Sequence, residues 1–306
     1  MRLNYRILTL LIAVSSFLFG VKAQNDLAQL ELKGSVKSLK EITSHATLDQ
    51  KNNIIQKDSF NQAVELVFIQ SGRLLKKSHW FDTKKNMGSK HTYTYDTLGF
   101  LNKIYNYSLD DHQESETVYT YNSQGEKIRT QEFIDGKLSQ DFSYKYNSKG
   151  QVIEFIEHSI NGKFIIEKTI FIYSGPNVFE KKIYNLANQL ESVQTCTYDS
   201  NGNNFIDEHR NGVGEVDLRV HYTYENNKLH ETNEYWFNKS KTTHYKMTYN
   251  EHGDQIESHM YYSDATPTEY NSTTYEYDNN NNWIKKIVYK NEIPMLVCER
   301  EIAYYE

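Results

Sequence analysis

The chain has 306 residues, with 34 basic against 40 acidic side chains and a formal net charge of −6. A nucleic-acid-binding protein normally presents a basic surface, so this balance argues against nucleic acid as a partner. With 25 tyrosines, 14 glycines and three prolines, the composition is neither collagen-like nor of low complexity. The abundance of tyrosine, threonine and isoleucine favours strands.

The first 23 residues have the layout of a secretory signal peptide. Arg2 and Arg6 form a basic start, an apolar run covers residues 7–19, and the small residues Val21 and Ala23 precede a cut at Gln24. An uncleaved anchor is the less favoured alternative, because the run is shorter than the ~20 residues of a spanning helix. We therefore expect export to the periplasm, the cell surface or the extracellular space, and no transmembrane segment in the mature chain.

Residues 24–60 form a lead-in region, in which we expect one strand near residues 36–47. The remainder, residues 61–306, is a tandem repeat of about 26 residues with copies such as Tyr93-Thr-Tyr-Asp-Thr-Leu-Gly99. The second aromatic residue of the copies recurs every 25 to 28 residues, at Phe68, Tyr95, Tyr121, Tyr146, Tyr173, Tyr198, Tyr224, Tyr249 and Tyr277.

Each copy predicts a β-hairpin. Aromatic residues two positions apart share one face of a strand. The Asp or Asn that follows can begin a turn, and a glycine three positions later suits the left-handed residue of a bulged hairpin connection. Two copies carry Asn177 or Asn281 in place of the glycine, and asparagine tolerates positive φ best among the other residues. The copy at Tyr222 instead offers Asn226-Asn227 for a two-residue turn.

The fold class that follows is all-β, with tandem antiparallel β-hairpin repeats forming a curled or superhelical single sheet. About twenty strands laid flat would span ~90 Å, which the right-handed twist of sheets does not permit. We expect the tyrosines to line the concave face. A lipid-facing barrel is disfavoured, because segments such as residues 126–132 alternate mostly charged and polar side chains.

The pattern Tyr-Asp-x-x-Gly-x-Leu, as in Tyr95-Asp-Thr-Leu-Gly-Phe-Leu101, resembles the YD repeat of the Rhs family over roughly residues 60–306. The lead-in residues 32–39 resemble the opening of small exported YD-type proteins of Bacteroidetes. This resemblance implies a secreted or cell-surface bacterial protein. The arginine that commonly follows the family's glycine is present only as Arg73, and the sequence has no C-terminal toxin domain, so toxin delivery is not implied.

Cys196 and Cys298 lie in the sixth and ninth repeats. A disulfide needs Cα atoms within ~7 Å, so we expect two free, partly buried thiols unless the sheet closes. The histidines, among them His91 and His158, are scattered through different repeats and predict no metal site. Residues 199–203 and 278–282 resemble calcium loops, but they coincide with the repeat turn and lack the glutamate of an EF-hand, so turn chemistry is favoured.

No catalytic motif is recognisable, and acid pairs such as Asp110-Asp111 and Asp207-Glu208 are not placed in any pocket by the sequence. We therefore expect a non-catalytic interaction or structural module of the cell envelope or extracellular space, with no cofactor. The alternative is a glycan-binding protein, and the partner is correspondingly a protein or a glycan. An enzyme acting on envelope polymers is the third candidate.

The repeat tyrosines are interpreted mainly as packing groups of a thin sheet. Aromatic residues outside the repeat positions are better candidates for ligand binding at the surface. These candidates are Trp80, Phe81, Tyr235, Trp236, Phe237, Tyr261 and Tyr262.

Overall fold

The computed structural model describes residues 26–51, 53–82, 87–175, 178–262 and 267–306. The predicted signal peptide and Asn177 lie outside these residues. The described part is almost wholly β-structure, with one short helix, α2 (Asp26–Gln29), and one 3-10 turn, η1 (Phe237–Lys239). Among the described residues, no helix has both the length and the apolar character needed to cross a membrane.

Twenty strands follow one another along the described residues, and each pairs antiparallel with the next. Their bounds are β1 (Val36–Leu48), β2 (Ile54–Phe68), β3 (Leu74–Asp82), β4 (Met87–Tyr95), β5 (Leu101–Ser108), β6 (Gln113–Tyr121), β7 (Lys127–Ile134), β8 (Lys137–Tyr146), β9 (Val152–His158), β10 (Ile165–Ser174), β11 (Val178–Tyr184), β12 (Leu190–Tyr198), β13 (Asn204–Asn211), β14 (Val216–Glu225), β15 (Lys228–Trp236), β16 (Lys241–Tyr249), β17 (Gln255–Tyr262), β18 (Pro267–Tyr277), β19 (Trp283–Lys290) and β20 (Ile293–Tyr304). The all-β, antiparallel hairpin prediction is confirmed.

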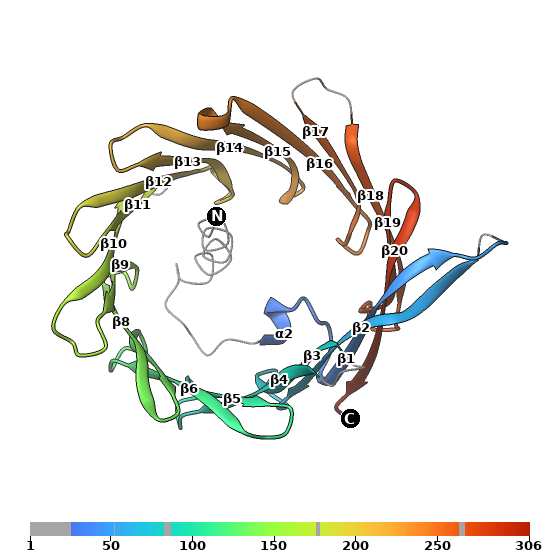
Figure 1. Ribbon diagram of the computed structural model, residues 1–306, viewed down its shortest axis with the longest axis horizontal. Coiled ribbons are helices and arrows are strands. Elements are labelled where there is room, and N and C mark those ends of the chain that lie inside the picture. Colours follow the sequence, from blue (N-terminus) through green and yellow to red (C-terminus); the bar gives the residue numbers. More distant parts are fainter. Residues whose placement is uncertain (1–25, 52, 83–86, 176–177, 263–266) are drawn as a thin grey trace.

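The prediction of an open curled or superhelical sheet is wrong, because the sheet closes into a barrel (Figure 1). The last strand, β20, pairs with the first, β1, from Val36 opposite Tyr304 to His45 opposite Leu296. An open sheet would leave the backbone groups of both edge strands unpaired, and closure removes both edges. Twenty strands at about 4.8 Å each give a perimeter of roughly 96 Å, and barrels of this size enclose a lumen.

A segment that precedes β1 fastens the closure from inside the ring. This segment, residues 26–35, is called the strap, and its helix α2 lies within the ring in Figure 1. At one end, the backbone nitrogen of Leu27 donates to the carbonyl oxygen of Gly72 over 3.3 Å. At the other end, the backbone nitrogen of Lys33 donates to Oδ1 of Asn282 over 2.8 Å. The strap therefore connects the first repeat to the last across the seam, which is the contact between β1 and β20 that closes the barrel.

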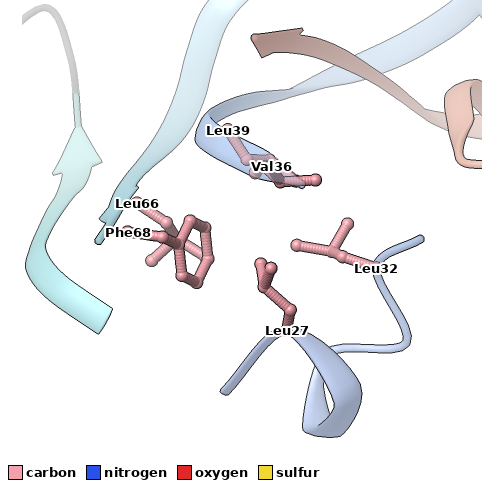
Figure 2. Close-up of a cluster of buried hydrophobic side chains, with 6 residues drawn as sticks. All are labelled: Leu27, Leu32, Val36, Leu39, Leu66 and Phe68. Atoms are coloured by element: carbon pink, nitrogen blue, oxygen red, sulfur yellow. The ribbon is translucent and has the colours of Figure 1, made fainter. Parts of the chain in front are cut away.

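A cluster of buried apolar side chains lies where the strap meets the barrel wall (Figure 2). Leu27 and Leu32 of the strap point toward Phe68 and toward Val36, and the exposed fractions of Phe68 and Val36 are 1% and 0%. Burying side chains of this kind contributes about 1.5–3 kcal/mol each. Apolar burial at the seam supports closure, and it identifies the face of β1 and β2 that carries Leu39 and Leu66 as the inner face.

The repeat turns have the predicted left-handed residue. Gly99 has a φ of 85°, and Oδ1 of Asp96 accepts from the backbone nitrogens of Leu98 and Phe100 over 2.9 and 2.8 Å. A register shift marks the predicted bulge beside Tyr95. Asn281 replaces glycine with a φ of 61°. Asn226 and Asn227, with φ of 50° and 60°, form the expected two-residue turn.

The repeat tyrosines join neighbouring hairpins. The hydroxyl of Tyr121 donates to the carbonyl oxygen of Leu101 over 2.8 Å, and Tyr146 donates to Lys127 over the same distance. Equivalent bonds run from Tyr95, Tyr173 and Tyr249 to the backbone of the preceding repeat. Each ring packs on the inner face while its hydroxyl caps a carbonyl one hairpin away. These tyrosines therefore stabilise the barrel, as the packing interpretation expects.

Candidate functional site

The structure separates the seven aromatic candidates into two groups. Trp80 and Phe81 lie on β3, whereas the other five lie on β15, η1 and β17. The ring of strands places β3 well away from β15–β17 (Figure 1). The seven residues therefore do not form one binding surface.

Within the second group, strand alternation sends neighbouring rings to opposite faces. Trp236 and Tyr262 belong to the inner face, where Nζ of Lys239 lies 5.0 Å from the Trp236 ring and Nζ of Lys241 lies 4.1 Å from the Tyr262 ring. Each of these inner rings therefore has one lysine ammonium near it.

Tyr235 and Tyr261 belong to the outer face of the same strands. The Tyr235 ring meets His221 edge-on at 5.7 Å, and the Tyr261 ring stacks on His244 at 5.3 Å and on His259 at 6.2 Å. Phe237, in η1, lies on the same side, since its ring centroid is 5.6 Å from Cζ of the outward-facing Arg219 and the residue is half exposed. Tyr235, Tyr261 and Phe237 are therefore the members of the group that lie on the outside of the barrel.

Other candidates from the sequence have structural roles. Asp207 faces inward and is buried, with its Oδ2 accepting from Gln194 over 2.8 Å, whereas Glu208 faces outward and pairs with Arg219. The two carboxylates therefore do not converge on one site. In the calcium-like turn, Oδ1 of Asp199 accepts from the backbone nitrogens of Asn201 and Asn203. Within the described residues, no group of three or more potential ligands is placed to hold a metal ion.

The cysteines are free and buried. Cys196 lies on β12 and Cys298 on β20, so closure of the sheet does not bring them together. Burial and the neighbouring Asp207 raise the pKa of the Cys196 thiol. The expectation of two unpaired thiols is confirmed, with deeper burial than predicted.

A cavity of about 200 Å³ lies between the strap and the tyrosines of β4 and β6. Its wall includes Lys127, whose ammonium lies 5.5 Å from the Tyr119 ring and 4.7 Å from the Tyr144 ring. Burial lowers the pKa of Lys127 to about 8. Lys127 therefore lies between the inward-facing rings of Tyr119 and Tyr144.

A larger cavity, of about 540 Å³, lies inside the barrel on the other side of the strap and is called the Trp283 cavity. The strap, the turn before β17, and strands β19 and β20 contribute to its wall. The lining residues are Leu30, Glu31, Leu32, Lys33, Lys228, His252, Gly253, Asp254, Asn281, Asn282, Trp283, Lys286 and Arg300. Its size is typical of small-molecule sites, which are roughly 300–1,000 Å³.

Two cations lie against the Trp283 ring. Cζ of Arg300 is 3.4 Å from the ring centroid, and Nζ of Lys286 is 4.4 Å from it. Such contacts with a tryptophan face contribute about 0.5–2 kcal/mol. Nε of Arg300 also donates to Glu41 on β1 over 2.9 Å. Burial lowers the pKa of Arg300, and the Glu41 carboxylate opposes that effect.

Two further lysines of the wall are held by backbone oxygens. Nζ of Lys228 donates to the carbonyl of Gly253 over 2.7 Å, and Nζ of Lys33 donates to that of Asn281 over 3.1 Å. His252 stacks on Tyr277 at 4.0 Å between ring centroids. The cavity therefore combines aromatic rings with four cations, each of which contacts either a ring or a backbone oxygen.

Sequence reasoning missed this group of residues. Trp283, Lys286 and Arg300 are not among the candidate residues predicted from the sequence. Their positions in the array give no signal of proximity to Lys33 or Lys228, because strap docking and closure bring them together. The one available hint is that Trp283 is the only tryptophan among the residues that lie opposite the repeat tyrosines, a position that Leu101, Lys127 and Val152 hold in other copies.

Comparison with known proteins gives distant likenesses only. No protein-family model and no curated protein matches the chain. A porin-like protein from Bacteroides uniformis aligns over 89% of this chain and 98% of its own, with 12% identity and a TM-score of 0.39. A porin-like protein from Bacteroides vulgatus aligns over 88% and 98%, with 10% identity and a TM-score of 0.33. The structure of TcdB2-TccC3-TEV aligns over 83% of this chain and 19% of its own, with 12% identity and a TM-score of 0.21.

Proposed function

We propose that the chain is a non-catalytic protein of the cell envelope or extracellular space that acts as an interaction module by binding a ligand inside its barrel. The Trp283 cavity carries this proposal, because its volume of about 540 Å³ suits a small ligand and its wall offers fixed polar groups. Small-ligand sites are usually preformed in this way.

The positions of one acid pair and the environment of one thiol support a non-catalytic role. Asp207 and Glu208 point to opposite faces of β13, whereas paired carboxylates of a glycosidase must flank one bond. A thiol with a raised pKa is a poor nucleophile, since the thiolate is the reactive form, and this applies to Cys196.

Export and kinship to the YD-repeat proteins belong to the same proposal. The basic and apolar start of the chain supports export, and the bulged Tyr-Asp turns support the kinship. Sequencing the N-terminus of the protein secreted by a bacterial host tests the first point. A mature chain beginning at Gln24 is expected, and an intact Met1 retained in the cytoplasm contradicts export.

Binding without turnover is the central test. The mature chain is heated with a panel of envelope-derived saccharides, neutral and acidic, and the midpoint of unfolding is measured. A ligand that binds only the folded barrel raises the temperature at the midpoint of unfolding. At a ligand concentration of 100 times its Kd, the added free energy of unfolding is about 2.7 kcal/mol. Chromatography of the same mixtures should show no product. Turnover by highly purified protein, or no shift across the panel, overturns the proposal.

A second candidate is glycan binding on the outer face of β15–β17. The observation in its favour is that Tyr235 and Tyr261 present their rings outward beside histidines. A glycan array probed with the wild type, Tyr261→Ala and Trp236→Ala separates the sites. Loss in Tyr261→Ala alone supports the outer face, whereas loss in Trp236→Ala alone supports the lumen.

A further inference from the structure

The Trp283 cavity has a local charge opposite to that of the whole molecule. Its wall carries four cations, Lys33, Lys228, Lys286 and Arg300, against two acids, Glu31 and Asp254. The formal charge of the wall is therefore +2, in a chain whose net charge is −6. Counting Glu41, which pairs with Arg300 from outside the wall, still leaves an excess of one positive charge.

Lys286 lacks a compensating acid. Its partners on the neighbouring strands are Tyr275 and Cys298, neither of which is a carboxylic acid. Its ammonium lies over Trp283, and none of the ion pairs within the described ranges involves Lys286. Lys228 and Lys33 likewise contact backbone oxygens and form no ion pair in that part of the chain.

The surroundings of Trp283 disfavour a neutral sugar as the main ligand. A neutral sugar binds a tryptophan by lying on its ring, but this ring already has Arg300 at 3.4 Å and Lys286 at 4.4 Å. Asn282 is also occupied, since its side chain bonds both backbone groups of Lys33. The ring instead holds two cations in place, and their unused N–H groups are donors suited to an anion.

We propose that the Trp283 cavity binds a small ligand through a carboxylate or sulfate group, which contacts Lys286 and Lys228 beside the Arg300–Trp283 stack. This inference rests on the proposed function and adds the chemical class of the ligand. The cavity lies in the lumen beside the strap, so binding replaces water around the cations with an oxyanion. Charge-assisted hydrogen bonds of this kind are roughly twice as strong as neutral ones.

Intrinsic fluorescence gives a direct test. The chain has three tryptophans, so the double variant Trp80→Phe/Trp236→Phe leaves Trp283 as the only reporter. The mature form of this variant is titrated with glucuronate, glucose 6-sulfate, glucose and inorganic sulfate. Saturable change with glucuronate or glucose 6-sulfate, and at least tenfold weaker binding of glucose, is expected. Competition by inorganic sulfate identifies the anionic group as the recognised part.

A matched pair of lysine variants locates the site. Lys286→Gln removes the inner cation and should weaken binding of the acidic sugar about tenfold. Lys285→Gln changes the preceding residue, whose Nζ lies 3.8 Å from Glu276 on the outer face, and should leave affinity unchanged. If Lys286→Gln does not fold, the salt dependence of the reporter variant decides, because an oxyanion contact must weaken as ionic strength rises.

The outcomes separate this inference from the general proposal. Binding of glucose as tight as that of glucuronate, equal affinity in the two lysine variants, or affinity independent of salt overturns the oxyanion site but leaves a lumen-binding module intact. Absence of any stabilising ligand across the neutral and acidic panel overturns the module itself.

Discussion

Asn282 and Lys33, 249 positions apart, bond to each other through both backbone groups of the lysine. The Lys33 nitrogen donates to Oδ1 of Asn282 and the Lys33 carbonyl accepts from Nδ2, each over 2.8 Å. The Asn282 side chain thereby acts as a strand partner for the strap. Asn282 directly follows the left-handed residue Asn281 of a repeat turn. This turn therefore also holds the strap and stabilises the contact between β1 and β20.

Replacing Asn282 should therefore weaken the seam selectively. Asn282→Ala leaves both backbone groups of Lys33 without this partner at a position where the asparagine is 4% exposed. We expect a loss of about 2–3 kcal/mol in the free energy of unfolding, measured with urea, since each unpaired buried group costs about 1–3 kcal/mol. Amide exchange in β1 and β20 should also become faster.

The control for this experiment is Asn203→Ala. Asn203 occupies the same turn position in an earlier repeat, but its side chain bonds only to Asp199 over 3.2 Å. Asn203→Ala should lower the free energy of unfolding by less than about 1 kcal/mol. Equal losses in the two variants would show that the turn, and not the strap, is what Asn282 stabilises.

The tyrosine hydroxyls should contribute measurably to the contact between repeats. Tyr146→Phe removes the 2.8 Å bond to the carbonyl of Lys127 while keeping the ring in place. We expect a loss of about 1 kcal/mol, the usual net value of such a bond. Tyr107→Phe, on the outer face of β5, serves as the control in the same urea titrations. A loss for Tyr107→Phe as large as that for Tyr146→Phe contradicts a specific role for the inner hydroxyl.

Substituting two turn glycines should distinguish the cost of backbone strain from the cost of steric crowding. Gly125 and Gly202 have nearly the same φ, 81° and 83°, but a Cβ on Gly125 would lie 2.6 Å from Cζ of Phe100, whereas one on Gly202 meets no atom within 4 Å. Gly202→Ala should cost about 1–2 kcal/mol from the left-handed backbone alone. Gly125→Ala should cost about 1–3 kcal/mol more, because the Phe100 ring must move. Equal losses, measured by thermal unfolding, would rule out the Phe100 contact as a constraint.

The sequence predicts the hairpin but not the ring, and the reason is physical. Turn chemistry is local: Asp96, Gly99 and Tyr95 lie within five residues of one another, so their pattern shows the bulged connection directly. Closure depends on β1 meeting β20, and on Asn282 meeting Lys33, which are contacts between the ends of the described chain. Nothing in one repeat distinguishes a ring from an open superhelix.

The Trp283 cavity could not be predicted from the sequence for the same reason, because closure of the barrel brings its residues together. Trp283 and Lys286 are visible in the sequence as members of one strand, but Lys33 and Lys228 join them only after closure. The sequence places Tyr235, Trp236, Tyr261 and Tyr262 in one group of candidates. Only the register of β15 to β17 shows that Tyr235 and Tyr261 face outward while Trp236 and Tyr262 face inward. Which of these residues bind a ligand stays a prediction.

The thiols should be inert in the native barrel. Cys196 and Cys298 are 6% and 3% exposed, and burial raises the pKa of Cys196. Titration with a chromogenic disulfide reagent should detect two thiols after denaturation and essentially none at the same time point in the folded protein. Fewer than two in the denatured, unreduced protein would reveal a disulfide and contradict the separation of β12 from β20.

Alkaline pH should destabilise the barrel through its inner tyrosines. Burial raises the pKa of Tyr173 to about 12, and burial together with Asp96 raises the pKa of Tyr121 to about 12, from a reference value of 10.0. The fold thus favours the neutral phenol, and its stability is unaffected while both states are protonated below pH 10. As pH rises from 10 toward 12, only the unfolded chain ionises freely, so the free energy of unfolding must fall. Tyrosinate absorbance should rise late in the folded protein and at lower pH in urea, and coincident titrations in the two conditions would contradict the packed hydroxyls.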